Sequence, residues 1–424
     1  MFFLFFLFKF LVNGIIYMRG DYMYDVIVIG GGPSGMMASI MAATNNKNVL
    51  LLEKNNKLGK KMLITGGGRC NVTNLKKLSD FYKELPVNHH FLKYSLNTFG
   101  PKQIYDYFIS LGVELKTEDN DRVFPAGDDS SFIVDALINE LEKTGVSIKY
   151  NAVVTDINKS NDCYIINTNE SSFETKNVVI ATGSKSFPKT GSSGDGYKFA
   201  SKFNQPITSL YPSQSPLSLK EPFPLSGITI DDVEIKLNGI NKRGSLLFTH
   251  NGISGPSVYK ISEYVYKEFQ KKGDVVVTIN FLPNLNYDKL VDLLNSYNPK
   301  KEIKTFVRDL LPARLADYLI LISGIDAINK IAVISNKNKN KLVSNMINLE
   351  VDVANRFSIE TSVVTGGGID IKYINNKTME SIINPGLYFT GELLDLHGST
   401  GGYNITIALS TGYIAGISID NNHQ

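Results

Sequence analysis

A glycine-rich stretch near the start of the chain constrains its fold more than any other feature. Residues 24–54 read YDVIVIGGGPSGMMASIMAATNNKNVLLLEK. The apolar run Val26–Ile29 leads into a Gly-x-Gly-x-x-Gly motif that begins at Gly30. Small residues follow, and then a second apolar run, Val49–Leu52. This order predicts a strand, a helix and a parallel strand, which form the first unit of a Rossmann-type sheet.

The spacing of the motif indicates a dinucleotide site. Gly30 suits the tight turn, Gly32 lets the backbone approach a pyrophosphate, and Gly35 lets the helix pack closely on the strand. The N-terminus of that helix offers free N–H groups and a positive dipole end to the pyrophosphate. Glu53 ends the second apolar run, where it is placed to accept hydrogen bonds from ribose hydroxyls.

The charge of the chain is nearly balanced. Its 424 residues suffice for two or three domains, and 44 Lys and Arg against 41 Asp and Glu leave a formal charge of +3. No global positive field marks a nucleic-acid binder, so no nucleic-acid partner is expected. The two cysteines, Cys70 and Cys163, form no metal-binding or disulfide pattern, which favours a reducing cytoplasm.

The N-terminal segment is set apart from this pattern. Met1–Met18 is almost wholly apolar, and Met23 stands directly before the predicted first strand. A signal peptide is not expected, because Lys9 interrupts the run and no small-residue cleavage site follows. We expect a disposable extension or a start of translation at Met23. A membrane anchor and a packed helix are the alternatives.

A second glycine-rich loop follows Glu53. Residues 57–74 read KLGKKMLITGGGRCNVTN, and the glycine triplet excludes a stable helix or an ordinary strand there. Lys60, Lys61 and Arg69 bring positive charge to the loop. We interpret it as backbone that approaches a flat or anionic group, with a flexible surface linker as the alternative.

The middle of the chain differs from its two ends. There, Ser-, Gly- and Pro-rich links join short alternating strands, followed by helical patterns and an Asn/Lys tract, 336–341. We expect this tract to be a surface turn, with contact with a polyanion as the alternative. Near the C-terminus, the strands predicted at 360–365 and 384–390 enter glycine turns, and HGSTGGYN at 397–404 opens a small-residue helix. The order of these segments along the chain predicts a Rossmann domain that is split by a mostly β insertion. Both halves of the Rossmann domain are expected to contribute to one site.

Motifs spread from Asp25 to Asn404 belong to one pattern. They read DVIVIGGGPSGMMAS, LGKKMLITGGGRCNVTN, DRVFP, ATGSKSFPKTGSSGDGY, LLFTHNGISGP, VVTGGGID and GLYFTGELLDLHGSTGGYN. Together they resemble the HI0933-like family of FAD-binding flavoproteins, also described as NAD(P)/FAD-dependent or aminoacetone-oxidase-like, within the glutathione-reductase-type superfamily. TGGGRCN and the closing motif are far more specific than Gly-x-Gly-x-x-Gly.

The resemblance implies an α/β fold with a Rossmann-like FAD-binding domain of the glutathione-reductase type. A mostly β domain with a helical subdomain is inserted into it. The expected boundaries are 1–22 for the extension, 23–190 and 351–424 for the two parts of the FAD-binding domain, and 191–350 for the inserted substrate domain, with its β part at about 191–282 and its helical part at about 285–340.

The resemblance also implies which residues hold FAD. Glu53 and Lys54 are expected at the adenosine ribose, Val154 at the adenine, Asp395 near the ribityl hydroxyls, and Gly402 to Asn404 at the pyrimidine edge of the flavin. The full expected set is Gly30, Gly32, Pro33, Ser34, Gly35, Glu53, Lys54, Lys61, Thr65, Gly67, Gly68, Arg69, Cys70, Asn71, Val154, Ala181, Thr182, Gly183, Gly391, Glu392, Asp395, Gly401, Gly402, Tyr403 and Asn404. A helix N-terminus beside the flavin ring would stabilise the negative charge of its reduced form.

Four residues are candidates for proton transfer at the flavin: His250, His397, Tyr403 and Arg122. For each of these residues, the alternative to proton transfer is a purely structural role. The family usually has an acid at the position of His397, and a histidine that contacts the flavin would titrate near neutral pH, whereas a loop histidine would face water. Cys70 lacks a partner at redox spacing, so close backbone packing is expected there instead.

These features favour an FAD-dependent oxidoreductase that moves a hydride between flavin and a small organic substrate, with an enone-type C=C bond as a candidate. No second dinucleotide fingerprint is present, so NAD(P)H is expected to reach the flavin only transiently. Two alternatives stay open: a tRNA-modifying flavoprotein, which the near-neutral charge disfavours, and a non-catalytic flavin-binding redox sensor.

Overall fold

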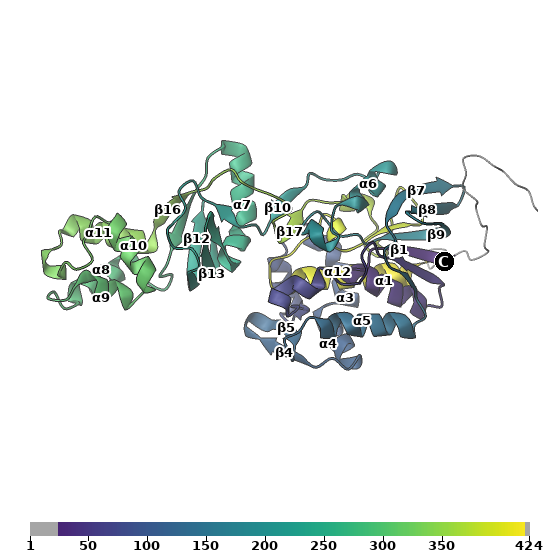
Figure 1. The fold of residues 1–424 in the computed structure, drawn as a ribbon, viewed down its shortest axis with the longest axis horizontal. Coiled ribbons are helices and arrows are strands. Elements are labelled where there is room, and N and C mark those ends of the chain that lie inside the picture. The colour runs from purple at the N-terminus through teal and green to yellow at the C-terminus, as the bar shows by residue number, and fades with distance from the viewer. Residues whose placement is uncertain (1–23, 420–424) are drawn as a thin grey trace, which may run out of the picture.

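The protein is elongated and has two domains. The computed structural model describes residues 24–419, and the predicted N-terminal extension lies outside them. Figure 1 shows that both ends of the described chain build one domain, the Rossmann domain, and that the middle builds the other, the inserted domain. Each has its own hydrophobic core. Within the described residues, none of the helices combines the length and apolar character needed to cross a membrane.

The main sheet of the Rossmann domain is centred on its first strand. Its strands are β1 (Tyr24–Ile29), β2 (Val49–Leu52), β6 (Ser147–Lys149), β7 (Val154–Ser160), β8 (Cys163–Thr168), β9 (Ser172–Ile180) and β18 (Leu387–Phe389). β1 lies between β2 and β9 and runs parallel to both, β6 extends the sheet beyond β2, and β18 pairs parallel with β9. β2 is buried along its whole length, as expected of a parallel strand with both faces covered.

Close packing of two helices determines where the site lies. The helices of this domain are α1 (Pro33–Thr44), α2 (Leu78–Phe81), α3 (Lys93–Thr98), α4 (Pro101–Ser110), α5 (Ser131–Lys143), α6 (Asp195–Lys202) and α12 (Tyr403–Ser418). A Cβ atom on Gly412 of α12 would lie 2.2 Å from the carbonyl oxygen of Ser34 in α1, and one on Gly416 would lie 2.5 Å from that of Ala38. This register makes α1 and α12 parallel. At 1.5 Å per residue, α12 begins about 12 Å before α1 along their common direction.

The second glycine loop is compact. Its backbone makes short 3-10 turns over Met62–Gly68 that are interrupted at Thr65, Gly66 and Gly67, and the two glycines have φ values of 58° and 71°. Such values suit glycine because it has no Cβ atom. The loop leads into a small antiparallel sheet that consists of β3 (Thr73–Asn74), β4 (Leu115–Glu118) and β5 (Arg122–Pro125).

The inserted domain combines an antiparallel sheet with a bundle of short helices. Its elements are β11 (Leu217–Ser218), β12 (Thr229–Leu237), β13 (Ile240–Thr249), β14 (Gly252–Ser254), α7 (Pro256–Lys272), β15 (Val276–Asn280), α8 (Tyr287–Ser296), α9 (Ile303–Arg308), α10 (Ala313–Ile322), α11 (Asn336–Ile347) and β16 (Leu349–Asp352). The sheet order is β11-β14-β13-β12-β15-β16. The helices α8 to α11 lie beyond the sheet, at the end of the molecule farthest from the Rossmann domain (Figure 1).

The predicted α/β class and the split Rossmann domain are confirmed, with two local differences. The core of the inserted domain begins at Leu217, whereas residues from 191 onward were assigned to that domain. α6 belongs to the Rossmann core, because Tyr197, Phe199 and Ala200 are buried there. The tract 336–341 is the first half of α11 and not a surface turn. The Ser335 hydroxyl caps this helix by accepting a hydrogen bond from the Asn338 N–H at 3.2 Å.

Two extended segments join the domains. β10 (Tyr211–Ser213) leads toward the inserted domain, β17 (Val364–Gly366) leads back, and the two pair antiparallel. The segment that enters the inserted domain and the segment that leaves it are therefore hydrogen-bonded to each other at the domain boundary.

Candidate functional site

A cavity of about 1340 Å³ lies at the carboxyl ends of β1, β2 and β9. Ile29 and Leu52 end the first two strands, Ala181 follows the third, and all three line the cavity. The inserted domain closes one side with β13 and α7, through Arg243 and Tyr259 among others. The crevice outside the carboxyl ends of a doubly wound sheet is where such folds bind ligands.

Most of the residues predicted to bind FAD meet in this cavity although they are far apart in sequence. Those that line it are Gly30, Gly32, Pro33, Ser34, Glu53, Lys54, Lys61, Thr65, Gly67, Arg69, Asn71, Val154, Ala181, Thr182, Gly183, Glu392, Gly401, Gly402, Tyr403 and Asn404. The other predicted residues, Gly35, Gly68, Cys70, Gly391 and Asp395, are absent from its lining. Gly35, for example, supports the wall by packing, because a Cβ atom there would lie 1.9 Å from the carbonyl oxygen of Gly30.

Two helix N-termini face the cavity. α1 begins after Gly32 and α12 begins after Gly402, and neither N-cap residue has a side chain that could satisfy the first N–H groups. A Cβ atom on Gly32 would meet no protein atom within 4 Å, so the space before α1 is open. The site therefore fits a long ligand with negative charge at two places, as a dinucleotide cofactor with a pyrophosphate and an ionisable ring would have.

Glu53 shapes the turn between β1 and α1. Its carboxylate is 7% exposed and accepts a hydrogen bond from the Gly31 N–H at 2.7 Å. The other carboxylate oxygen accepts hydrogen bonds from the backbone and side-chain N–H groups of Asn55 at 2.8 and 2.6 Å. Glu53 thus stabilises the glycine turn. It also lines the cavity, where its remaining lone pairs can accept hydrogen bonds from ribose hydroxyls.

Two lysines of the cavity wall are held by carboxylates. Lys61 Nζ lies 2.6 Å from Glu392 Oε2 and donates to the Ser186 hydroxyl at 2.7 Å. Lys54 Nζ lies 2.7 Å from Asp195 Oδ2. These pairs fix the positions of the two ammonium groups.

Arg69 is fixed in the same way. Its guanidinium lies 4.1 Å above the ring of Phe124, its Nε lies 2.7 Å from an oxygen of Asp128, and it also pairs with Glu118. Stacking on an aromatic ring and pairing with two carboxylates hold the guanidinium plane in one orientation. Arg69 therefore forms a rigid part of the cavity wall.

Cys70 is a packing residue. It is fully buried with a φ of 57°, and burial raises the pKa of its thiol to about 12, partly opposed by a hydrogen bond with Thr65. Its thiol therefore stays protonated at neutral pH and is a poor nucleophile. This agrees with the expectation that Cys70 is no redox thiol.

The four candidates for proton transfer lie in different places. Arg122 and Tyr403 line the cavity, and burial raises the pKa of the Tyr403 phenol, whose ring packs on Phe81 with centroids 4.7 Å apart. His250 is exposed and lies outside the cavity lining. His397 borders a separate, smaller cavity of about 70 Å³ at the domain boundary.

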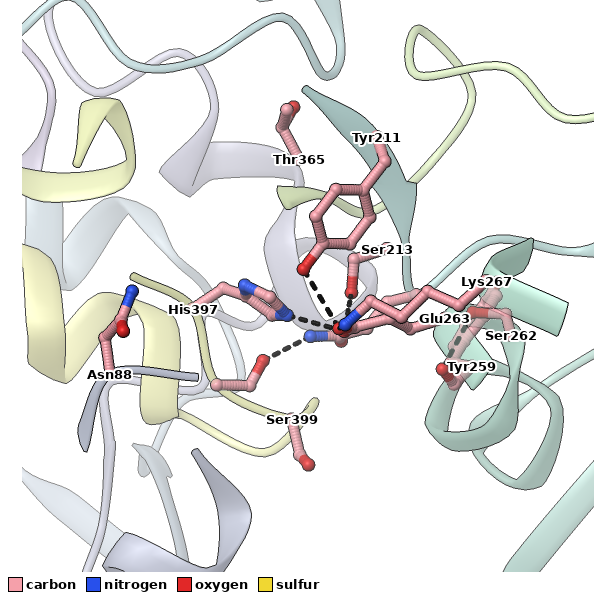
Figure 2. A network of polar contacts seen from close by, with 12 residues as sticks. Asn88, Tyr211, Ser213, Tyr259, Ser262, Glu263, Lys267, Thr365, His397 and Ser399 are labelled. Atoms are coloured by element: carbon pink, nitrogen blue, oxygen red, sulfur yellow. Dashed lines mark hydrogen bonds and ion pairs between the residues drawn. The ribbon is translucent and has the colours of Figure 1, made fainter. Parts of the chain in front are cut away.

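His397 is buried, with 1% of its surface exposed. The alternative that it is a loop histidine facing water is therefore wrong. Its Nε2 lies 2.7 Å from Oε2 of Glu263, a carboxylate of α7 that is 5% exposed. Figure 2 shows that Tyr211 and Ser213 also point at this carboxylate, and their hydroxyls donate to it at 2.9 and 3.1 Å. Lys267 completes the ring of donors.

The charge of Glu263 is strongly stabilised. Burial by itself raises its pKa, but the hydrogen bonds and charges of His397 and Lys267 prevail and lower the pKa to about 2. Sequence reasoning missed this residue. A signal was present: Glu263 stands next to Ile261, Ser262 and Val265, which are also buried on α7, and an acid on the buried face of a helix requires a partner.

The comparisons with known proteins agree on one family. A model of the HI0933-like protein Rossmann domain matches residues 24–418. The ribosomal RNA dihydrouridine synthases of Haemophilus influenzae and Escherichia coli are 33% and 32% identical to this chain over 93% and 92% of it, and over 98% and 96% of their own lengths. The 3-dehydro-bile acid delta(4,6)-reductase of Clostridium scindens is 29% identical over 92% of this chain and 97% of its own.

A solved structure agrees with the fold. The 3-ketosteroid delta1-dehydrogenase of Sterolibacterium denitrificans matches 94% of this chain and 99% of its own with a TM-score of 0.52. At 12% identity, that likeness establishes the fold alone.

Proposed function

The chain belongs to the HI0933-like family of FAD-binding flavoproteins, and on this premise we propose that it is a reductase of C=C bonds conjugated with a carbonyl group. One observation carries the proposal. By their names, relatives that align along nearly the whole chain make dihydrouridine or reduce a delta(4,6) bile acid. Both reactions saturate a C=C bond that is conjugated with a carbonyl group, and such a bond accepts a hydride at one carbon and a proton at the other.

For the substrate, we propose a uracil base of ribosomal RNA. The relatives that carry this activity in their names are 33% and 32% identical to the chain, which covers 98% and 96% of their lengths. The proposal replaces the expectation of no nucleic-acid partner, which rested on net charge alone. Net charge over 424 residues is insensitive to local clusters of charge.

The cavity walls supply binding and orientation for this chemistry. When bound, FAD carries the hydride, for which we propose NAD(P)H as the source. The N-termini of α1 and α12 would hold the pyrophosphate and the flavin ring, and the Lys61–Glu392 pair would lie along the cofactor between them. Tyr403 stays protonated at neutral pH because burial raises its pKa, so we propose its hydroxyl as the proton donor to the substrate carbon.

The test uses purified, FAD-loaded protein under anaerobic conditions with NADH or NADPH and an unmodified transcript of ribosomal RNA. We expect the flavin absorbance to bleach on addition of the nucleotide and to return on addition of the transcript, with dihydrouridine found by mass spectrometry of the digested RNA. Bleaching without any dihydrouridine would overturn the RNA substrate. A flavin that neither nucleotide reduces would overturn NAD(P)H as donor, and a flavin that no donor at all reduces would favour the redox-sensor alternative.

A small enone is the second candidate substrate, favoured by the bile-acid reductase at 29% identity. A panel of free enones with ring systems of increasing size, measured in the same assay, separates the two. Turnover of a free enone with no turnover of RNA would establish this candidate.

A further inference from the structure

We propose that the helical tip of the inserted domain, residues 285–347, is a docking surface for the phosphate backbone of the RNA substrate. The inference rests on the proposed function and adds to it the place where the RNA is held. Figure 1 shows α8 to α11 at the end of the molecule remote from the Rossmann domain, so the tip lies far from the cavity in which chemistry takes place. A contact there is of use only to a large substrate.

The tip carries an excess of positive charge. Residues 285–347 contain ten Lys and Arg and six Asp and Glu, a formal charge of +4, whereas the whole chain has +3. The remaining residues therefore carry one more acid than base. A local excess of cations suits a surface that binds polyanions.

Backbone pairing gathers four of these lysines. The Ile303 N–H donates to the Asn329 carbonyl at 2.9 Å and the Ile331 N–H to the Lys301 carbonyl at 3.0 Å, with residues 302 and 330 directly opposite. This brings the segment with Lys300, Lys301 and Lys304 beside Lys330. Lys304 pairs with Glu302 at 2.6 Å, and Glu302 lies opposite Lys330 in the bridge, whereas Lys300 and Lys330 are exposed.

α11 adds a second group of lysines at its N-terminal end. Lys337, Lys339 and Lys341 lie in its N-terminal half, and its first turn has no acidic residue. The positive end of the helix dipole repels cations at such positions. A polyanion bound beside the first turn would offset this repulsion.

The same tip exposes apolar side chains. Ile328 and Val333, which flank Lys330, are 62% and 72% exposed, and Leu321 at the end of α10 is 70% exposed. Lysines next to exposed apolar groups suit nucleic acid, where cations meet phosphates and apolar side chains meet sugars and bases.

The test compares two variants that change the charge equally. K300E/K330E alters the tip, and K102E/K143E alters two lysines of the Rossmann domain whose side chains are 69% and 75% exposed. Binding of the ribosomal transcript is followed by fluorescence anisotropy at several salt concentrations, together with dihydrouridine formation and bleaching of the flavin by NADPH. Thermal unfolding checks that both variants fold.

We expect K300E/K330E to weaken RNA binding about tenfold at low salt and to reduce the salt slope by about 1.5, because two phosphate contacts are lost. Flavin bleaching should stay unchanged in both variants. Equal RNA affinity and slope in the two variants would overturn the docking surface while leaving the proposed function in place. RNA binding through these lysines without dihydrouridine formation would overturn only the proposed function. Loss of binding to anionic phospholipid vesicles without loss of RNA binding would assign the tip to membranes and overturn the inference.

Discussion

The carboxylate of Glu263, in the inserted domain, lies 2.7 Å from the imidazole Nε2 of His397, in the Rossmann domain. Both side chains are buried, so the pair ties the two domains together beside the cavity. The loop that carries His397 continues through Ser399 to Gly402 along the cavity wall and into α12. The position of the inserted domain is thereby coupled to the helix N-terminus proposed to hold the flavin ring.

The Glu263 carboxylate should make stability depend on pH in the acid range. Its pKa falls from the ordinary 4.5 to about 2 on folding, so its contribution is fully present above pH 4.5 and is lost as the pH falls toward 2. The shift corresponds to about 3 kcal/mol. Urea unfolding of wild type and Glu263→Gln from pH 7 to pH 3 should show a difference in unfolding free energy that narrows on acidification. Asp135→Asn, at an exposed position of α5, is the control, and a difference that does not vary with pH would contradict this assignment.

Two glycine substitutions should separate cofactor binding from folding. Gly32→Ala places a methyl group in the open space before α1 at an allowed φ of −81°, so we expect a stable protein that binds FAD much more weakly. Gly412→Ala places the methyl group 2.2 Å from the Ser34 carbonyl oxygen, so we expect a loss of about 1–3 kcal/mol of stability from overpacking. Flavin titration and urea unfolding measure the two effects. FAD binding by Gly32→Ala equal to wild type would argue against a cofactor at α1.

The Lys61–Glu392 pair should behave as one unit in FAD binding. Both side chains are largely buried, and Lys61→Met leaves the Glu392 carboxylate unpaired in the cavity wall. We expect weaker FAD binding in Lys61→Met and partial recovery in Lys61→Met/Glu392→Gln, with a coupling energy of about 1 kcal/mol. The FAD dissociation constants of all four proteins complete the cycle. Additive effects would show that the two residues act on the cofactor independently.

The two cysteines should differ in reactivity. Burial raises the pKa of Cys70 to about 12, whereas the Cys163 side chain is partly exposed. Iodoacetamide at neutral pH should label Cys163 and leave Cys70 unmodified, with no loss of flavin reduction. Peptide mass spectrometry locates the label. Rapid modification of Cys70 in the folded protein would indicate a reactive thiol and reopen a redox role.

The local parts of the site were predictable from sequence. The turn at Gly30, the acid at Glu53 and the glycine triplet in residues 57–74 could be assigned because each depends on the conformation of a few neighbouring residues. The helical part predicted at about 285–340 contains α8 to α10 and the start of α11. The tract 336–341 was misassigned because alternating Asn and Lys residues look solvated, while its helix depends on the Ser335 cap and on burial of Leu342 and Val343 further along.

The sequence by itself determined the Rossmann fold, the family and the set of glycine-rich segments that face one cavity, because local patterns of glycine and apolar residues encode turns, strands and helix starts. Only the tertiary structure decided the partners of the polar side chains. Glu263 and His397 are 134 residues apart, and Lys61 and Glu392 are 331 residues apart. No local pattern encodes such pairings, because they arise only when packing of the whole chain buries one charge beside another.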